Sequence, residues 1–198
     1  IETTLDPRLQ SLAVASLRSG LEALDRRQGY RGHLRHVEQS EIAAELTRVA
    51  EQNKLSAASD PDSALGPDAT YAGVVLSVDA RAQTARVGFA PDLSALVRLA
   101  DVSWARSPDP AVEATPVRSI DKIFRTGDVA QFQRVPPPAA EPTDAEAPEQ
   151  EPLPAGSVLV GLTQEPLVQG ALLSLDVAAD VVLALVGGYS YRESEFDR

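Results

Sequence analysis

The sequence predicts an α+β chain that is mainly β, with two helices followed by about five strands and a C-terminal hairpin. Three observations support this prediction. Leucines recur at helical spacing near the N-terminus, Val-rich alternating segments begin at Tyr71, and two apolar runs near the C-terminus are separated only by Ala178 and Ala179. Aromatic residues make up only 5% of the 198 residues, so aliphatic side chains must supply most of the packing.

The first helix is predicted to begin at Asp6 and Pro7. An aspartate can accept a hydrogen bond from a free backbone N–H at the helix start, and proline suits the first helical position. Gly29 and Gly32 are predicted to end the helix. One apolar stripe is predicted along it, formed by Leu9, Leu12, Leu17, Leu21 and Leu24.

A second helix is predicted from Glu38 or Ser40 to about Gln52, and residues 56–68 then form a polar loop. From Tyr71 the apolar period becomes that of strands. The predicted strands cover residues 71–79, 84–90, 95–105, 129–135 and 157–166. Their spacing favours a meander, which is compatible with a small barrel of the OB type.

Residues 136–154 hold seven prolines and five acidic residues and no basic residue, which predicts a solvated loop. The last two strands are predicted over 168–177 and 180–189, joined by a tight turn at Ala178-Ala179. Gly187 and Gly188 are predicted to permit close backbone approach at the strand end.

Composition excludes several classes of function. The net charge of −11 disfavours nucleic acid as a partner, because phosphate binding relies on Lys and Arg. The absence of cysteine excludes disulfides, Cys-ligated zinc and thiol nucleophiles. No apolar run reaches the length of a membrane helix. The chain begins with Ile1 and contains no Met, so we expect it to be a processed or excised piece of a longer protein.

One candidate binding face consists of Phe89, Arg98, Trp104 and Arg106, because aromatic and cationic side chains on an OB-type surface can stack on a ligand. The alternative, which we favour, is that Trp104 packs one end of the barrel. Tyr30 with Arg31 is a candidate anchor between the preceding segment and the barrel.

Candidate catalytic and metal-binding residues are sparse. Ser119 and Lys122 form one S-x-x-K, but neither an S-x-N nor a K-T-G element accompanies them, so we predict a turn into a strand. His33 and His36 could share a metal ion, yet no third ligand is well spaced, and loop histidines are the simpler interpretation. We therefore predict no metal, cofactor or catalytic residue in this chain.

A run of carboxylates occupies one face of the second predicted helix, formed by Glu38, Glu41 and Glu45. Paired carboxylates can act as general acid and base. A charged helix face is more simply interpreted as a solvated surface.

Five segments resemble, in order, the class A penicillin-binding proteins, particularly the 1A subtype. TTLDPRLQ and GLEALDRRQGYRG resemble the linker after the glycosyltransferase domain. GVVLSVD, TARVGF, LADVSWAR and IFRTGDV resemble the inserted OB-like domain, and LTQEPLVQGALLSLDVAADVVLALVGGYSYRESEFDR resembles the start of the transpeptidase domain. The chain departs from the family pattern at Ser190, Tyr191 and Asp197, and has Asp180 where the family often has glycine.

The resemblance implies three parts: an inter-domain linker over 1–32, an inserted OB-like domain over 33–165, and the first transpeptidase strands over 166–198. It implies a non-catalytic module of a bifunctional peptidoglycan synthase, in the periplasmic part of a bacterial protein anchored in the inner membrane. The expected partners are the glycosyltransferase and transpeptidase domains of the same chain, and a docked outer-membrane lipoprotein activator or peptidoglycan.

Two other functions remain open at this point. The chain could be an independent OB-type module that binds oligosaccharide or single-stranded nucleic acid, although the charge of −11 opposes the latter. A self-contained enzyme is the other possibility, but the sequence supplies no catalytic constellation for it.

Overall fold

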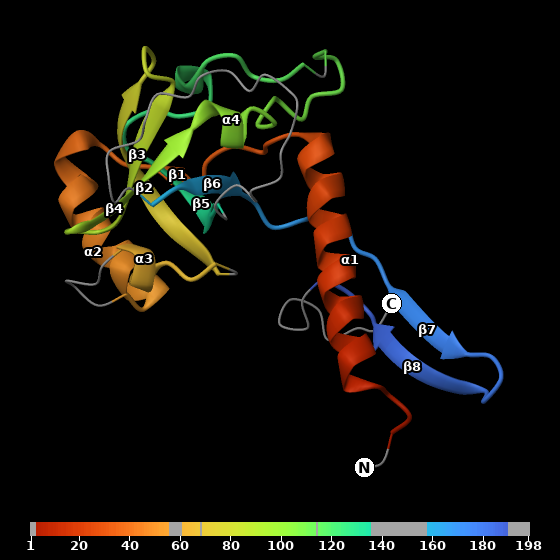
Figure 1. The fold of residues 1–198 in the computed structure, drawn as a ribbon. Coiled ribbons are helices and arrows are strands. Elements are labelled where there is room, and N and C mark those ends of the chain that lie inside the picture. Colours follow the sequence, from red (N-terminus) through yellow and green to blue (C-terminus); the bar gives the residue numbers. More distant parts are fainter. Residues whose placement is uncertain (1–2, 56–60, 68, 114, 136–157, 190–198) are drawn as a thin grey trace, which may run out of the picture. The chain divides into compact units, whose positions relative to one another are not determined.

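A computed structural model of the chain describes residues 3–55, 61–67, 69–113, 115–135 and 158–189 (Figure 1). The chain forms two compact units. The helix–hairpin unit consists of Ile1–Gly29 and Glu165–Arg198, and the barrel unit consists of Tyr30–Gln164. The predicted acidic loop 136–154 and the terminal residues 190–198 lie outside the described residues. Helices combine with mainly antiparallel sheets, which confirms the predicted fold class.

The barrel unit contains one antiparallel sheet in the order β1-β5-β2-β3-β4. Strand β6 pairs with β5 as well. The short β1 was not predicted, because two residues carry no strand pattern. The strands are β1 (Arg35–His36), β2 (Thr70–Asp79), β3 (Thr84–Ala90), β4 (Leu93–Arg98), β5 (Asp128–Arg134) and β6 (Val160–Thr163).

The sheet closes where β4 meets the segment that leads into β6. The backbone N–H of Leu96 donates to the Val158 carbonyl at 2.9 Å, and Leu96 forms a parallel bridge with Leu159. The cyclic order β5-β2-β3-β4-β6 therefore makes a five-stranded barrel, the architecture of an OB fold.

Aliphatic and aromatic side chains fill the barrel, and one glycine makes room for them. The rings of Phe89 and Phe132 meet edge to face, with centroids 6.0 Å apart. A Cβ atom on Gly73 would lie 2.5 Å from Val87 and 2.8 Å from Phe89. Gly73 is therefore required by close packing inside the barrel, where even one extra methyl group must displace its neighbours.

A helix covers the outer face of the barrel. The turn η1 (Gln39–Glu41) leads into α2 (Ile42–Asn53), which confirms the second predicted helix. Its buried side chains pack against β2 and β5, in a cluster formed by Ile42, Leu46, Val49, Ala72, Val74 and Val129. The Asn53 side chain both donates to and accepts from the backbone of Ala72, which fixes the end of α2 on β2.

Three short helical turns interrupt segments predicted as loop or strand. They are α3 (Pro61–Ala64), α4 (Leu99–Val102) and η2 (Ile120–Lys122). The predicted strand over 95–105 is wrong beyond Arg98, where α4 begins. The reason is local: the Arg98 guanidinium reaches the Asp101 carboxylate across one helical turn, and the N–H of Leu99 donates to the Gln83 carbonyl.

In the helix–hairpin unit, α1 (Pro7–Gln28) begins and ends as predicted. Asp6 Oδ1 accepts from the N–H groups of Arg8 and Leu9, at 2.8 and 3.0 Å, and Gly29 follows the helix with φ 104°. The predicted leucine stripe is only partly correct, since Leu21 is buried but Leu9, Leu12 and Leu24 are exposed.

The face of α1 that packs on the hairpin is centred on a small residue. Ala13 is buried against Ala184 and Val186, with Val14, Leu17 and Leu172 around them. A methyl side chain lets the helix approach the strand closely, which a stripe of leucines would prevent.

The hairpin consists of β7 (Leu172–Asp176) and β8 (Val181–Val186), as predicted, but its turn is longer than the predicted two residues. Residues 177–180 form the turn, and Asp176 Oδ1 accepts from the N–H groups of Ala178 and Ala179. Asp180 adopts φ 54°, a left-handed conformation that glycine favours and aspartate tolerates.

Beyond β8, Tyr189 is fixed to α1. Its hydroxyl donates to Glu22 Oε1 at 2.8 Å, and Arg18 Nε donates to its carbonyl at 3.0 Å. The Arg18 guanidinium also lies 5.8 Å from the centre of the Tyr189 ring. Burial, followed by the hydrogen bond and charge of Glu22, raises the pKa of Tyr189 to about 12.

We expect this raised pKa to be visible in a titration of tyrosinate absorbance. The difference in absorbance between the original chain and Tyr189→Phe, plotted against pH, should have a midpoint at about 12 instead of the ordinary 10.0. Because folding raises the pKa, the stabilisation from Tyr189 is complete below the ordinary value and is lost as the pH rises toward about 12. A difference curve centred at the ordinary value would contradict this contact.

Two glycine substitutions should have opposite effects on stability. Gly73→Ala should lower the free energy of unfolding of the barrel unit by about 1–3 kcal/mol, because the new methyl group overlaps Val87 and Phe89. Gly20→Ala, at an open position inside α1, should stabilise by about 1 kcal/mol through helix propensity. Denaturant unfolding measures both, and a neutral Gly73→Ala would contradict the packing described for the barrel.

Candidate functional site

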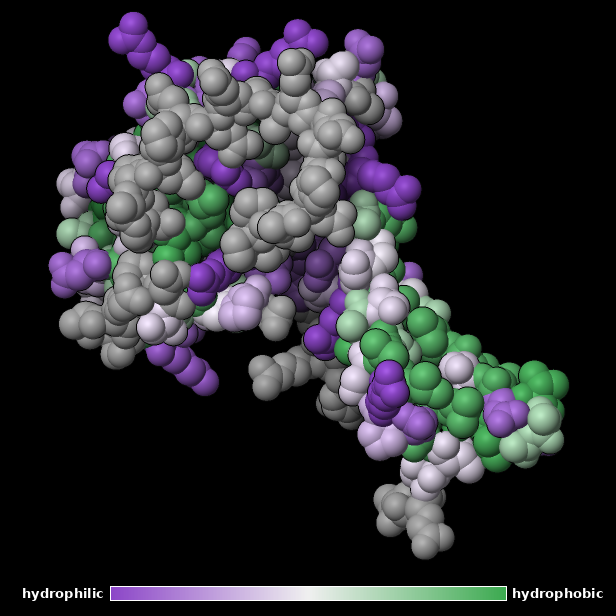
Figure 2. Space-filling model, viewed as in Figure 1, coloured by the Kyte–Doolittle hydropathy of each residue, from purple (hydrophilic) through white to green (hydrophobic). Residues whose placement is uncertain are grey.

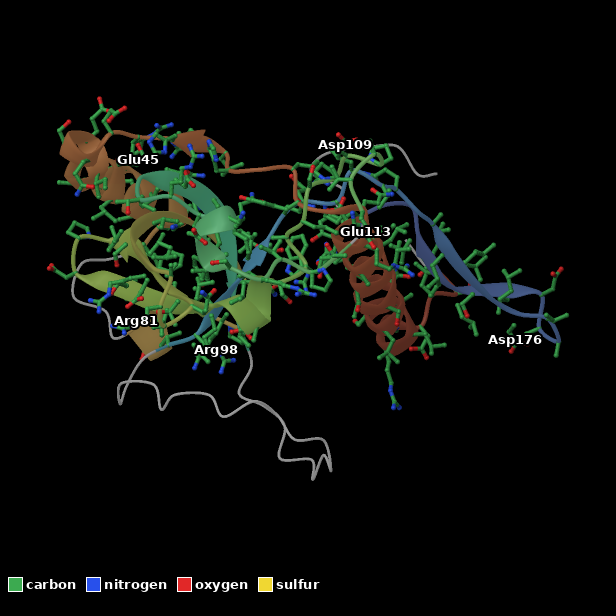
Figure 3. The ribbon with its side chains drawn as sticks, turned by 90° about the horizontal axis from the view of Figure 1, so that it is seen from above. Glu45, Arg81, Arg98, Asp109, Glu113 and Asp176 are labelled. Atoms are coloured by element: carbon green, nitrogen blue, oxygen red, sulfur yellow. The ribbon has the colours of Figure 1, made fainter. Side chains whose placement is uncertain are left out.

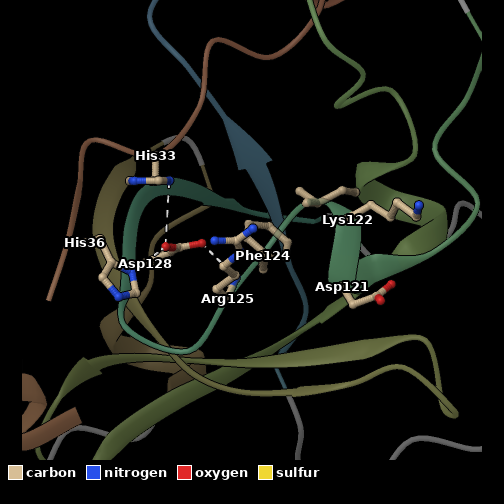
Figure 4. Close-up of a pocket in the computed structure, with 8 residues that line it drawn as sticks. His33, His36, Asp121, Lys122, Phe124, Arg125 and Asp128 are labelled. Atoms are coloured by element: carbon tan, nitrogen blue, oxygen red, sulfur yellow. Dashed lines mark hydrogen bonds and ion pairs between the residues drawn. The ribbon is translucent and has the colours of Figure 1, made fainter. Parts of the chain in front are cut away.

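A cavity of about 790 Å³ opens in the barrel unit beside the start of β5 (Figure 4). Two segments form it: the chain around β1 and the turn that runs from η2 into β5. Its size lies in the range of small-ligand pockets, although its lining is more polar than usual. The lining residues are His33, His36, Asp121, Lys122, Ile123, Phe124, Arg125 and Asp128.

Asp128 is the centre of this site, and only 3% of its surface is exposed. Its Oδ1 lies 2.8 Å from Nδ1 of His36 and 3.7 Å from Nδ1 of His33, while Oδ2 accepts from the backbone N–H of Arg125 at 2.7 Å. Figure 4 shows the two imidazole rings on either side of this carboxylate. A buried carboxylate is thus satisfied by imidazole and backbone donors.

The turn before β5 creates this geometry. Gly127 has φ 93°, and a Cβ atom there would lie 2.1 Å from the Val37 carbonyl oxygen, so only glycine fits. The N–H of Val37 donates to the Gly127 carbonyl, and β1 pairs His36 with Asp128. The sequence predicted the turn at 126–128, but it gave no signal that His36 would lie opposite Asp128.

The contact with Asp128 fixes the role of each nitrogen in His36. A carboxylate only accepts hydrogen bonds, so Nδ1 must carry the proton that is donated to it. In the neutral ring, Nε2 is then an acceptor. A carboxylate that orients a histidine in this way is a common means of presenting the second ring nitrogen to a ligand.

Two cations line the cavity as well. Lys122 and Arg125 are exposed, and neither side chain has an ion-pair partner among the described residues. Figure 4 shows Arg125 beside Asp128, and Lys122 with Asp121 on the η2 side of the cavity. The cavity can therefore offer hydrogen-bond donors to an anionic group. Within the described part of the chain, no three His, Cys, Asp or Glu side chains form a group that could hold a metal ion.

One member of the predicted binding face, Phe89, lies inside the barrel. Phe89 is 0% exposed and faces Tyr71 and Phe132 inside the barrel, so it cannot stack on a ligand. Arg98, labelled in Figure 3, makes a two-point contact with Asp101, at 2.8 and 3.1 Å. Binding by Arg98, Trp104 and Arg106 remains a prediction.

Trp104 packs edge to face on Tyr30, with ring centroids 6.2 Å apart. The backbone N–H of Tyr30 donates to the Arg106 carbonyl at 2.8 Å, and that of Arg31 donates to Gln164 Oε1 at 3.1 Å. Burial, and secondly the charge of Asp128, raises the pKa of the Tyr30 hydroxyl. Residues 30 and 31 are thus held on the barrel by backbone bonds and ring packing.

Ser119 shows no sign of activation. Its hydroxyl donates to the Asp121 carboxylate, and the Lys122 ammonium makes no hydrogen bond to it in the part of the chain that the structure describes. A transpeptidase serine needs its lysine as a neighbouring base. The S-x-x-K match coincides with the short turn η2, which begins directly after Ser119.

The predicted solvated carboxylate face is only partly correct. Glu38 and Glu41 are exposed, but Glu45 is 7% exposed and accepts hydrogen bonds from Arg35 on β1 and from Arg48 on α2. Its position on α2 is visible in Figure 3. The sequence could not reveal this pairing, because it depends on β1 lying beside α2 in the folded barrel unit.

The model of the penicillin-binding protein OB-like domain family matches residues 30–168. Penicillin-binding protein 1A of Rickettsia felis is 26% identical over 198 residues, which is 100% of this chain and 20% of that protein. Penicillin-binding protein 1A of Neisseria flavescens is 57% identical over 37 residues, which is 19% of this chain and 5% of that protein.

Among solved structures, a crystal structure of penicillin-binding protein 1A from Haemophilus influenzae has a similar fold. Its TM-score is 0.60 at 19% identity, and the match covers 99% of this chain and 23% of that one. The chain thus spans about a fifth of the length of the full-length relatives that it matches. None of the helices in the described ranges is both long and apolar enough to cross a bilayer.

We expect the centre of the cavity to be important for stability. Asp128→Ala should lower the free energy of unfolding by about 1–3 kcal/mol, because the Arg125 N–H loses its buried acceptor and His36 its partner. Asp109→Ala is a matched control, since Asp109 is exposed and its carboxylate accepts from the Ala111 N–H in a surface turn. Equal effects of the two substitutions in denaturant unfolding would contradict the assigned role of Asp128.

Proposed function

Since the chain belongs to the family of penicillin-binding protein OB-like domains, we propose that it is the non-catalytic linker and OB-like module of a bifunctional penicillin-binding protein of the 1A type. The match over residues 30–168 carries this proposal. The parent protein polymerises peptidoglycan strands and cross-links their peptides, and this module lies in its periplasmic part, outside the inner membrane. The barrel unit is then the inserted domain, and it spaces the two active sites.

The surface of the hairpin supports the assignment of residues 166–198 to the start of a larger domain. One face of the hairpin packs on α1, but the opposite face is apolar too. Leu173 and Leu185 are cross-strand partners with 56% and 43% of their surfaces exposed, and Leu175 is 54% exposed. Figure 2 shows this hydrophobic area over β7 and β8. A sheet that is apolar on both faces is typical of one buried between two layers.

The two edges of the hairpin also support this assignment. The outer edge of β8 is closed by the N-terminal segment: Asp6 N–H donates to the Leu183 carbonyl at 2.9 Å, and the Gln10 amide bonds both backbone groups of Leu185. No such side-chain cover lies along β7 among the described residues. Further strands of the transpeptidase sheet would therefore join at β7, since an open edge offers unpaired backbone groups.

The sequence of this chain supports a non-catalytic role, and the spacer role is proposed on that basis. The serine of S-x-x-K at 119–122 is bound to Asp121, and the sequence contains neither an S-x-N nor a K-T-G element to complete a transpeptidase site. Docking of an outer-membrane lipoprotein activator or of peptidoglycan belongs to the proposal as well.

Labelling with a fluorescent penicillin tests this function. We expect no covalent label on the 198-residue chain, whereas the full-length parent should be labelled at its own serine. Ser119→Ala in the parent should leave the labelling unchanged. Stoichiometric labelling of the isolated chain that disappears on Ser119→Ala would overturn the proposal.

A further inference from the structure

The cavity around Asp128 contains the oriented imidazole of His36 and two cationic side chains. Neither cation forms an ion pair with another residue in the described part of the chain. Asp128 occupies Nδ1 of His36 and leaves Nε2 as an acceptor. Arg125 and Lys122 supply positive charge at the same cavity. Asp121 and Asp128 line the cavity too, so its charges balance. Asp128 is already bonded to His36 and to the Arg125 N–H, and Asp121 accepts from Ser119, which leaves the two cations as the groups that can contact an anion.

The shape of the cavity selects the class of ligand. A concave site of about 790 Å³ suits a small molecule, whereas a stable protein partner covers a far larger and flatter surface. Polar side chains dominate the lining, and Phe124 is almost fully buried, so there is no open aromatic platform for a neutral sugar among the lining residues. The complementary ligand is therefore small, polar and anionic, with hydroxyl or amide donors.

We propose that this cavity binds a carboxylate-bearing fragment of peptidoglycan, namely an N-acetylmuramyl peptide. Its carboxylate pairs with the Arg125 guanidinium, a hydroxyl donates to Nε2 of His36, and Lys122 adds a second positive charge to the lining. This choice of ligand rests on the proposed function, because a module of a peptidoglycan synthase meets such fragments in the cell wall. The site is separate from the predicted surface with Arg98, Trp104 and Arg106, none of which lines the cavity.

The two histidines provide a direct reporter. They are the only histidines in the chain, and both line the cavity, so every imidazole signal in an NMR spectrum comes from this site. Titration of the 198-residue chain with N-acetylmuramyl-L-alanyl-D-isoglutamine should shift both sets of ring signals in a saturable manner. The neutral disaccharide of N-acetylglucosamine should cause no saturable shift at the same concentrations.

Substitution of the cation gives the decisive comparison. Arg125→Gln removes the charge from an exposed side chain and should weaken binding about tenfold, since a charge-assisted contact is lost. Arg81→Gln is the matched control, because Arg81 lies in the β2–β3 turn, labelled in Figure 3, and does not line the cavity. Its affinity should equal that of the unaltered chain. Lys122→Gln should weaken binding less than Arg125→Gln.

Several results would overturn the proposal. Among them are the absence of saturable shifts, and equal affinities for Arg125→Gln and Arg81→Gln. If acetate shifted the histidine signals as strongly as the muramyl peptide, the cavity would be a general anion site. If a blocked triglutamate peptide bound more tightly than the muramyl peptide, the ligand would be an acidic protein segment. Penicillin labelling tests the proposed function independently. If the chain is not labelled and does not bind the muramyl peptide, the proposed ligand of the cavity is wrong, and the proposed non-catalytic function is unaffected.

Discussion

Closure of the barrel between β4 and β6 is the constraint on which the rest of the barrel unit depends. Strand β6 follows a long segment after β5, yet it must return to the β5 edge and also meet β4. Once Leu96 bonds to Val158, the main edges of the sheet are paired and the interior is sealed around Phe89 and Phe132. The same closure fixes β5, whose first residue, Asp128, organises the cavity.

The two units differ in how completely they bury their apolar surface. The barrel unit has an interior of fully buried side chains and an outer face covered by α2. The helix–hairpin unit has only a small buried cluster around Ala13 and Ala184, and it exposes leucines on the hairpin and along α1. The barrel unit therefore has its own hydrophobic core, whereas the described residues of the helix–hairpin unit bury a much smaller apolar cluster.

Local signals in the sequence predicted the helices, the main strands and the hairpin, because capping residues, glycines and periodicity act over a few residues. Asp6, Gly29 and the Val-rich strands are examples. Phe89 shares a strand face with Ala85 and Val87, so alternation alone indicates the barrel interior, and the rings of Tyr71 and Phe132 enclose it there. Other errors have non-local causes. The pairing of His36 with Asp128 joins residues 92 apart, so no spacing rule could indicate it.

The beginning and the end of the barrel unit lie side by side, since the N–H of Arg31 donates to the side chain of Gln164. When the two ends of a segment are held close together, the entropy cost of closing the segment rises only slowly with its length. Lengthening a loop of the barrel unit would therefore cost little chain entropy, and it would leave the hydrogen bond between the two ends of the unit in place.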